Sequence, residues 1–255
     1  MLPQYERLVD PGSPGGPESS PTRSAYRVRF GKLAVITVMF PVVGFLFCVV
    51  WSLLYNFDQA NATHCMVYNF LPSLSAAIGN YQPQRFVWQA SVLLHALPRY
   101  AIAFLYKNFH LGLLRKRRTD LAVLACMLNI TELSSLVGLT MWTSVSNYDV
   151  HKFCFSTFVV TSMLYMVVLI IINRVTREGD LLTASERKSI MYKKRLFIAN
   201  LCSILLAVYL LYSLFALSEY VFVYSNIGFH MTAYWDFISA NLFFDWKNGI
   251  HFSAV

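Results

Sequence analysis

Charged side chains are scarce in this 255-residue chain, and their scarcity argues against a soluble globular protein. Only 13% of the residues are Asp, Glu, Lys or Arg, whereas 56% are hydrophobic and the mean hydropathy is +0.49. A soluble fold covers its surface with about a quarter charged residues. The composition therefore indicates an integral membrane protein, most of whose surface faces lipid.

The sequence also lacks the short motifs by which many catalytic and nucleotide sites are recognised. It contains no Gly-x-Ser-x-Gly, His-Glu-x-x-His, P-loop or Rossmann fingerprint. Its five cysteines have no metal-ligand or redox spacing, so we expect no metal and no bound cofactor. Cys65 and Cys154 are both expected on the lumenal side, where a disulfide could join them, but the spacing does not decide this.

Uncharged runs of helix length are abundant. A helix needs about 20 residues to cross roughly 30 Å of hydrocarbon. We expect an all-α, polytopic transmembrane helix bundle of about six spans, at residues 33–54, 86–106, 121–142, 153–172, 196–214 and 216–235. The last apolar block has no obvious turn residues, because Gly and Pro are absent from 196–227. A five-span arrangement, in which this block crosses once, therefore stays open.

Two tails flank this bundle, which we place at residues 26–238. Residues 1–25 are rich in Pro, Gly and Ser and are expected to be a disordered cytosolic tail, and residues 239–255 form a C-terminal tail.

The net charge of +8 is distributed unevenly. Seventeen Lys and Arg residues precede the first span or lie in the second and fourth loops, whereas the other two early loops hold only Arg85 and Lys152. Basic loops stay in the cytosol, so the pattern predicts a cytosolic N-terminus. The basic clusters are expected to meet anionic membrane lipid, and nucleic acid is excluded as a partner because no nucleic-acid-binding motif accompanies them.

The first lumenal loop, about residues 55–84, carries a glycosylation sequon that begins at Asn61. Asn61 is therefore a candidate glycosylation site, although it lies only a few residues from the first span.

Ionisable side chains inside hydrocarbon are costly, so each one is a candidate functional residue. His95 and Arg99 are spaced i, i+4 and share one face of the second span. Asn129 and Glu132 share a face of the third span. In the last span, three polar residues fall within about 40° of one another at 100° per residue; they are Glu219, Asn226 and His230. We therefore expect a polar cavity inside the bundle.

The roles expected for these residues follow from their chemistry. A His or Glu can act as general base on a hydroxyl, and an Arg can bind a phosphate or stabilise an oxyanion. The catalytic candidates are His64, from the lumenal loop, His95, Glu132, Glu219 and His230; the substrate-binding candidates are Arg99, Asn129 and Asn226. The structural alternative is that Arg99 and Glu132 form a salt bridge that holds two helices in register.

Several blocks of sequence resemble one known membrane family. They are Asn-Ala-Thr-His-Cys at 61–65, Asn-Phe-Leu-Pro-Ser at 69–73, Ala-Ala-Ile-Gly at 76–79, Pro-Gln-Arg-Phe-Val-Trp at 83–88 and Phe-His-Met-Thr-Ala-Tyr-Trp-Asp-Phe at 229–237. These blocks are similar, in the same order, to those of the Frag1/DRAM/Sfk1 membrane family. The resemblance extends from about residue 27 to residue 237, nearly the whole chain apart from its tails.

That resemblance implies a multi-pass protein of the Golgi membrane, with the endoplasmic reticulum as a second location. It implies a role in the lipid remodelling of glycosylphosphatidylinositol (GPI)-anchored proteins. The implied reaction is the reacylation of lyso-GPI with a saturated fatty acyl chain on the lumenal side, with acyl-CoA or a phospholipid as acyl donor. The chain would be the GPI-anchor acyltransferase itself or an essential component of it, with GPI-anchored proteins and other remodelling factors as partners.

An alternative from a different class is a non-catalytic membrane adaptor or lipid-presenting protein in the maturation and transport of GPI-anchored proteins. It would share the cavity but would lack an acid–base pair within hydrogen-bond reach. A channel or transporter ranks last, because the sequence has neither inverted repeats nor paired helix breaks.

Overall fold

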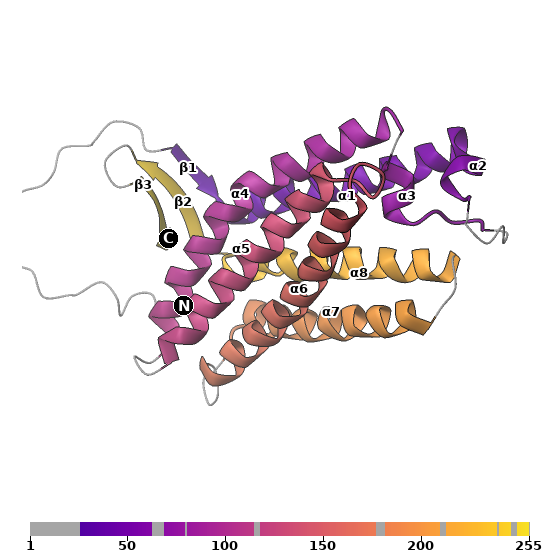
Figure 1. Cartoon of the computed structure of the whole chain (residues 1–255). Helices are drawn as coiled ribbons and strands as arrows, with labels where there is room; N and C mark the ends of the chain where they lie inside the picture. The colour runs from indigo at the N-terminus through magenta and orange to yellow at the C-terminus, as the bar shows by residue number, and fades with distance from the viewer. Residues whose placement is uncertain are drawn as a thin grey trace, which may run out of the picture.

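The computed structural model describes residues 26–62, 69–79, 81–114, 118–176, 182–209, 213–238, 240–245 and 249–254. Over this part of the chain, six long helices pack into one bundle (Figure 1). They are α1 (Phe30–Tyr55), α4 (Gln84–Leu113), α5 (Thr119–Met141), α6 (Tyr148–Thr176), α7 (Ala184–Tyr209) and α8 (Ser213–Met231). The predicted helical membrane bundle is confirmed.

Short elements lie at the two ends of this bundle. Helices α2 (Phe57–Ala60) and α3 (Leu74–Ile78) follow α1 at one end, which we call the α3 end (Figure 1). At the other end, which we call the terminal end, α9 (Ala233–Asp236) follows α8, and three strands form a small sheet; they are β1 (Tyr26–Arg29), β2 (Ala240–Asp245) and β3 (Gly249–Ala254).

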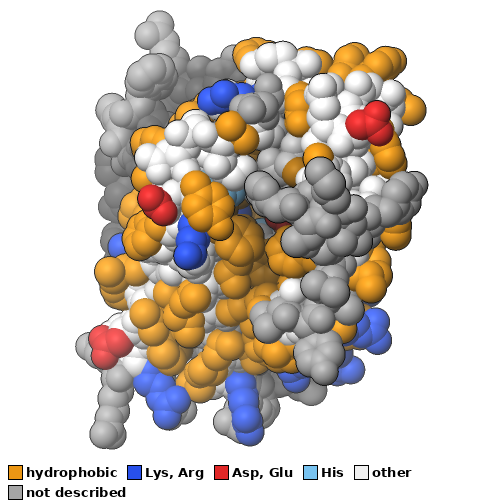
Figure 2. Space-filling view, turned by 45° about the vertical axis from the view of Figure 1, so that its right-hand side comes forward, with side chains coloured by type: hydrophobic (Ala, Val, Ile, Leu, Met, Phe, Trp, Pro, Cys, Tyr) orange, Lys and Arg blue, Asp and Glu red, His pale blue; other side chains and the backbone are white. Residues whose placement is uncertain are grey.

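Three of the described helices, α1, α5 and α6, are long and apolar enough to cross a membrane by length and composition. Helices α4 and α7 are more polar, because α4 carries Arg99 at mid-length and α7 begins in a charged segment. Large apolar side chains point outward, among them Ile36, Leu97 and Met127, which are 58%, 72% and 63% exposed. Figure 2 shows hydrophobic side chains over the middle of one face and several Lys and Arg side chains along its lower edge. Such an apolar band is expected of a surface that faces lipid.

The last apolar block forms two helices that lie side by side, α7 and α8 (Figure 1). Asn200 of α7 joins them, because its Nδ2 donates to the carbonyl oxygen of Phe222 at 3.0 Å and to Ser225 Oγ at 2.9 Å. Helix α7 begins earlier than the expected residue 196. Thr183 and Glu186 form a capping box there: the Thr183 backbone N–H donates to Glu186 Oε2, and the Glu186 N–H donates to Thr183 Oγ1.

The sheet was not predicted from the sequence. Its strand order is β1-β2-β3 with antiparallel pairing, so the segment before α1 pairs with the segment after α9. The backbone on either side of the bundle therefore meets at one end, which requires an even number of membrane crossings between β1 and β2. This arrangement favours six spans over five.

A buried ion pair stabilises the terminal end. Lys193 Nζ of α7 contacts Asp236 Oδ2 of α9, and both side chains are 3% exposed. Asp236 also accepts hydrogen bonds from Ser189 and from the hydroxyl of Tyr106 on α4. The pair thus connects α7, α9 and α4.

Helices α1 and α4 approach closely at Gly44. A Cβ atom at this position would lie 2.5 Å from Ser91 Oγ and 2.8 Å from Ser91 Cβ, both of which are too close. Small residues allow such contacts between membrane helices.

We expect Gly44→Ala to destabilise the protein by about 1–3 kcal/mol, because the new methyl group overpacks the contact between α1 and α4. Thermal unfolding of the detergent-solubilised protein should show a lower Tm, and the double variant Gly44→Ala/Ser91→Gly should recover most of the loss. Val43→Ala, on the exposed side of the same turn, is the control. An unchanged Tm for Gly44→Ala would mean that the two helices are not in close contact at this position.

Candidate functional site

Six of the eight residues expected to carry chemistry meet in the middle of the bundle. They come from α4, α5 and α8 and form what we call the central cluster: His95, Arg99, Asn129, Glu132, Asn226 and His230. Helix spacing explains why each helix contributes a pair, since residues three or four positions apart share a face. The bundle then turns these three polar faces toward one another.

Arg99 is the centre of this cluster and is 6% exposed. Its Nη2 donates to Asn129 Oδ1 at 2.8 Å and lies 3.0 Å from His230 Nδ1 and 2.8 Å from His230 Nε2. Its Nη1 lies 3.3 Å from His95 Nε2. The guanidinium is therefore held by side chains from three helices, α4, α5 and α8.

Glu132 is fully buried and supplies the negative charge. Its Oε1 accepts hydrogen bonds from Asn226 Nδ2 at 2.9 Å and from His230 Nε2 at 3.0 Å. Its Oε2 lies 3.8 Å from Arg99 Nη2. Because a carboxylate only accepts hydrogen bonds, Nε2 of His230 carries the proton in this contact. Arg99 Nη2 then donates to Nδ1, and its approach to Nε2 is a contact between two donors and not a hydrogen bond.

His95 is fixed by the backbone of α1. Its Nδ1 lies 2.8 Å from the carbonyl oxygen of Thr37, which can only accept, so Nδ1 is protonated and Nε2 is the acceptor. Helix α4 continues through Pro98, which lies between His95 and Arg99. His95 and Arg99 are therefore presented by one continuous helix.

Two residues of α6 complete the cluster and were missed in the sequence. Ser162 Oγ accepts from Asn226 Nδ2, and the Tyr165 hydroxyl accepts from Asn129 Nδ2 at 3.4 Å. The Tyr165 ring also stacks on His230, with centroids 5.3 Å apart and planes 15° apart. The only local signal was their i, i+3 spacing, which is weak for uncharged side chains in an apolar run.

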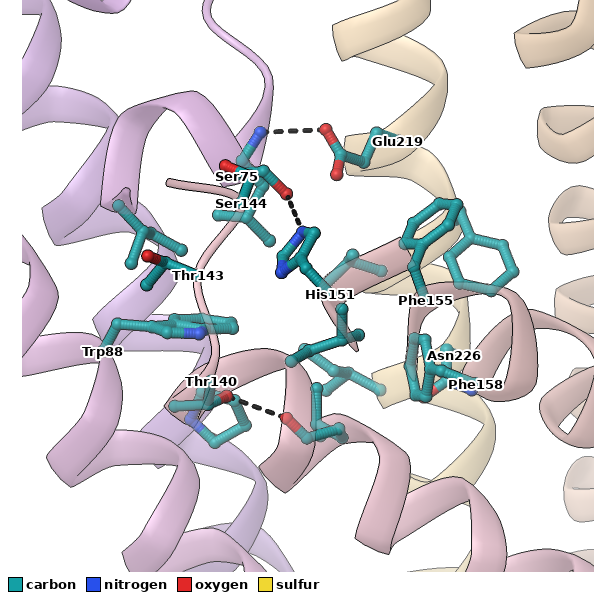
Figure 3. A pocket seen from close by; sticks show the side chains of 18 of the residues that line it. Ser75, Trp88, Thr140, Thr143, Ser144, His151, Phe155, Phe158, Glu219 and Asn226 are labelled. Atoms are coloured by element: carbon teal, nitrogen blue, oxygen red, sulfur yellow. Dashed lines mark hydrogen bonds between the residues drawn. The ribbon is translucent and has the colours of Figure 1, made fainter. Parts of the chain in front are cut away.

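A cavity extends from the central cluster toward the α3 end of the bundle. Figure 3 shows several of the side chains that line it, Asn226 of the central cluster among them. Arg99, His95 and Asn226 line its inner end, and Ser75, His151 and Glu219 line its outer end. The wall between them is mostly apolar and includes Leu136, Leu139, Phe155, Phe158, Phe222 and Val223. The space between its lining side chains is about 860 Å³, a figure that includes open solvent.

Helix α8 gives the depth of this cavity. Glu219 and Asn226 both line it, and their separation of seven residues corresponds to about 10 Å along the helix axis. Glu132 and His230 do not line the cavity; both contact Arg99, which does. Arg99 is therefore the charged group of the central cluster that a ligand in the cavity would meet.

The remaining predicted residues lie apart from the central cluster. Glu219 faces the outer end of the cavity, where its Oε2 accepts the backbone N–H of Leu74 at 2.8 Å (Figure 3). Asn61 is 6% exposed, and its Nδ2 donates to the carbonyl oxygen of Phe57 at 3.0 Å, so the folded chain does not present this nitrogen for a glycan. His64 and Cys65 lie outside the described residues. The catalytic role expected of His64 and a disulfide between Cys65 and Cys154 therefore stay predictions.

One further pair of residues at the outer end was not expected. Ser75 Oγ and His151 Nε2 lie 3.1 Å apart, and both side chains line the cavity (Figure 3). Within the described residues, no three His, Cys, Asp or Glu side chains are placed to hold a metal ion together.

Residues 29–240 match the model of the Frag1/DRAM/Sfk1/Cwh43P N-terminal domain, a range that contains the whole cavity and central cluster. The chain belongs to this family. The resemblance read from the sequence blocks is thus confirmed, and the chain is a membrane protein.

Several relatives are similar to the chain over most of their length. A Drosophila pseudoobscura pseudoobscura protein named post-GPI attachment to proteins factor 2 is 41% identical over 98% of each chain. A Xenopus tropicalis protein named acyltransferase PGAP2 is 43% identical over 88% of this chain and 93% of its own. A Caenorhabditis elegans protein, named post-GPI attachment to proteins factor 2, is 37% identical over 79% of this chain and 83% of its own. No solved structure matches the chain.

Proposed function

We propose that this protein remodels the lipid of GPI-anchored proteins by transferring a saturated fatty acyl chain to the free hydroxyl of lyso-GPI on the lumenal side of the Golgi membrane. The names of its relatives, post-GPI attachment factor and acyltransferase, support the process and the reaction class. The observation that carries the proposal is one cavity that combines a buried arginine, an apolar wall and two histidines whose Nε2 atoms are unprotonated.

Arg99 suits the anionic part of the substrate. A guanidinium binds phosphate through paired, charge-assisted hydrogen bonds, and it stabilises an oxyanion when it is held in place beforehand. Glu132 and His230 contact it and hold it in place, so little reorganisation is needed when the ligand arrives. In this proposal Arg99 binds the inositol phosphate, or the oxyanion of the acyl carbonyl, at the inner end of the cavity.

The apolar wall suits the acyl chain, which gains free energy when its methylene groups leave water. The proton of the acceptor hydroxyl goes to a histidine. His95 faces the cavity with Nε2 as its acceptor nitrogen, and the Glu132–His230 acid–base pair contacts Arg99. The acyl donor is acyl-CoA or a phospholipid, whose chain enters the same wall.

The lumenal assignment rests on charge. Loops at the α3 end carry few basic residues, whereas the basic clusters lie toward the terminal end. Arg99 is 14 residues beyond Arg85, roughly 21 Å along α4, and the cavity provides a path from the α3 end to that depth. Residence in the Golgi, with the endoplasmic reticulum second, and association with other remodelling factors belong to the same proposal.

The test is direct transfer by the purified protein. Wild-type protein in liposomes should convert lyso-GPI and a labelled saturated acyl donor into the two-chain lipid, measured by mass spectrometry. We expect Arg99→Ala and His230→Ala each to lower the rate by at least about 10²-fold. The first removes the positioned guanidinium, and the second removes a side chain that holds it in place.

Arg85→Ala is the matched control, since it lies on the same helix and does not line the cavity. Unchanged turnover in both Arg99→Ala and His230→Ala would remove these residues from the reaction. If folded wild-type protein binds lyso-GPI but transfers nothing, the non-catalytic adaptor or lipid-presenting protein becomes the better description.

A further inference from the structure

The outer end of the cavity holds an acid–base pair that the central cluster does not include. Ser75 of α3 and His151 of α6 approach through Oγ and Nε2 at 3.1 Å (Figure 3). His151 Nδ1 lies 2.8 Å from the carbonyl oxygen of Trp142. A carbonyl oxygen only accepts, so Nδ1 carries the ring proton and Nε2 is the unprotonated nitrogen. The Ser75 hydroxyl therefore donates to a histidine whose tautomer the backbone has set.

The Ser75 hydroxyl, the His151 ring and the Trp142 carbonyl are arranged like the groups of an activated serine nucleophile. A hydroxyl becomes a useful nucleophile when an adjacent base can take its proton, and a third group orients that base. Here the Trp142 carbonyl orients His151, in the position that a carboxylate occupies in the Ser-His-Asp arrangement. Both Ser75 and His151 are only partly buried, so the pair is open to a ligand in the cavity.

Helix α3 holds Ser75 in place from several directions. Pro72 precedes the helix, and the Ser73 side chain caps it by accepting the N–H of Ala76 at 3.2 Å. On one side, the Tyr220 hydroxyl donates to the carbonyl of Pro72, and on the other side Ser52 Oγ donates to the carbonyl of Ala77 at 3.0 Å. These hydrogen bonds come from α8 and α1, so they fix the position of α3 relative to both helices.

Glu219 makes a third hydrogen bond to α3, at Leu74, the residue before Ser75. Its Oε2 accepts the Leu74 N–H at 2.8 Å, and Figure 3 shows this contact beside the Ser75–His151 pair. Asn147 helps to place His151, because Asn147 Oδ1 accepts the N–H of Val150 and its carbonyl accepts the N–H of His151. Pre-organised geometry of this kind is what a reacting group requires.

We propose that Ser75 is a catalytic nucleophile that carries a fatty acyl chain as an ester, with His151 as its general base. The assignment rests on the acyl-transfer function proposed above and names the group that performs it. The ligand class is a long-chain acyl carbonyl, supplied as the thioester of acyl-CoA or the oxygen ester of a phospholipid. Apolar side chains beside the pair, including Phe155 and Phe158, receive the chain.

The first step loads the serine. Ser75 Oγ attacks the acyl carbonyl carbon while its proton passes to His151 Nε2. The bond from that carbon to the donor sulfur or oxygen breaks, and the leaving thiolate or alkoxide takes the proton from His151. The product is acyl-Ser75 plus a free thiol or a lysophospholipid.

The second step transfers the acyl chain from Ser75 to lyso-GPI. The free hydroxyl of lyso-GPI attacks the same carbonyl carbon, its proton passes to His151, and the ester bond to Ser75 breaks as Oγ regains a proton. One ester bond is broken and one is formed, with no oxidation or reduction. In this scheme Arg99 binds the anionic part of the lipid at the inner end, and Glu132 and His230 are positioning residues for it.

The test is an adduct on Ser75 of the full chain. Purified protein is incubated, without lyso-GPI, with alkyne-labelled palmitoyl-CoA or with liposomes of phosphatidylcholine that carries an alkyne-labelled saturated chain. We expect the label on the peptide that contains Ser75, from whichever donor the protein uses. His151→Ala should form at least about 10³-fold less adduct, and Ser75→Ala should form none there.

Ser75→Cys separates chemistry from folding. Its adduct is a thioester, which neutral hydroxylamine releases, whereas the wild-type oxygen ester resists this reagent. Ser156→Ala, an exposed serine of α6 that bonds only within its own helix, is the matched control and should label and transfer as wild type does.

Transfer to lyso-GPI is measured in the same samples. If wild-type protein transfers chains and Ser75→Ala does so at the wild-type rate, the nucleophile assignment is overturned and the proposed function stands. If Ser75 becomes acylated but no chain reaches lyso-GPI, the nucleophile stands and the acceptor was wrong. If neither adduct nor product forms in folded protein, both proposals fall.

Discussion

Glu132→Gln should destabilise the folded protein by about 3–5 kcal/mol, because it leaves the buried guanidinium of Arg99 without a carboxylate. Glu132 is 0% exposed and Arg99 is 6% exposed, so water cannot replace the lost charge. The amide oxygen of the glutamine can still accept from His230 Nε2, so the loss comes from the missing negative charge. Denaturant unfolding of the purified protein in mixed micelles should measure the loss.

Two variants make this prediction specific. Glu219→Gln is the matched control, since Glu219 only accepts the Leu74 N–H and a glutamine oxygen can do the same; we expect a change below about 1 kcal/mol. Removing both charges, in Glu132→Gln/Arg99→Met, should recover part of the stability, because no unpaired ion remains. Equal stability of wild type and Glu132→Gln would show that the two charges do not depend on each other.

Asp236→Asn should have a comparable effect at the other end of the bundle, also about 3–5 kcal/mol. Lys193 and Asp236 are each 3% exposed, so the substitution leaves an ammonium group buried without a counter-charge. It also weakens the acceptor for Ser189 and Tyr106. Because these residues belong to α7, α9 and α4, we expect loss of the contact between the last two long helices and the rest of the bundle, measured as a lower Tm.

Asp149→Asn is the control for this second prediction, because Asp149 is exposed in the first turn of α6 and should contribute less than about 1 kcal/mol. Asp236→Asn/Lys193→Met should restore most of the stability. If Asp236→Asn alone behaves as the exposed control does, the buried pair is not what joins these helices.

The central cluster unites the two alternatives that the sequence left open. Arg99 and Glu132 do form a salt bridge between α4 and α5, as the structural alternative states. Arg99 also lines the cavity, as the functional one requires. Stability measurements on Glu132→Gln and transfer assays on Arg99→Ala therefore address separate properties of one network.

Local sequence was sufficient for the helices and for their polar faces. Uncharged runs predict membrane helices because hydrocarbon leaves backbone groups only helical partners, and this holds whatever the neighbours are. The i, i+4 spacing of His95 and Arg99 likewise depends only on helix geometry. Because ions are costly in lipid, the few that occur in these runs were expected to meet, and six of the eight candidates do.

Contacts between distant segments depended on the tertiary structure. The β1–β2 pairing joins segments from opposite ends of the described chain, and neither segment has a strong strand pattern of its own. Helices α7 and α8 are joined by Asn200, which donates to Phe222 and Ser225 across the pair. Such contacts depend on how helices pack, which local periodicity does not encode.

The Ser75–His151 pair shows most clearly that contacts between distant segments depend on helix packing and not on local sequence. One residue lies in a short helix after a loop and the other near the start of α6, and neither carries a motif or an unusual charge. The sequence by itself determined a scarcely charged, helical membrane protein of a recognisable family, because composition, periodicity and family blocks are local properties. Only the tertiary structure decided which polar groups share a cavity, because that depends on which helix faces the close packing of the bundle brings together.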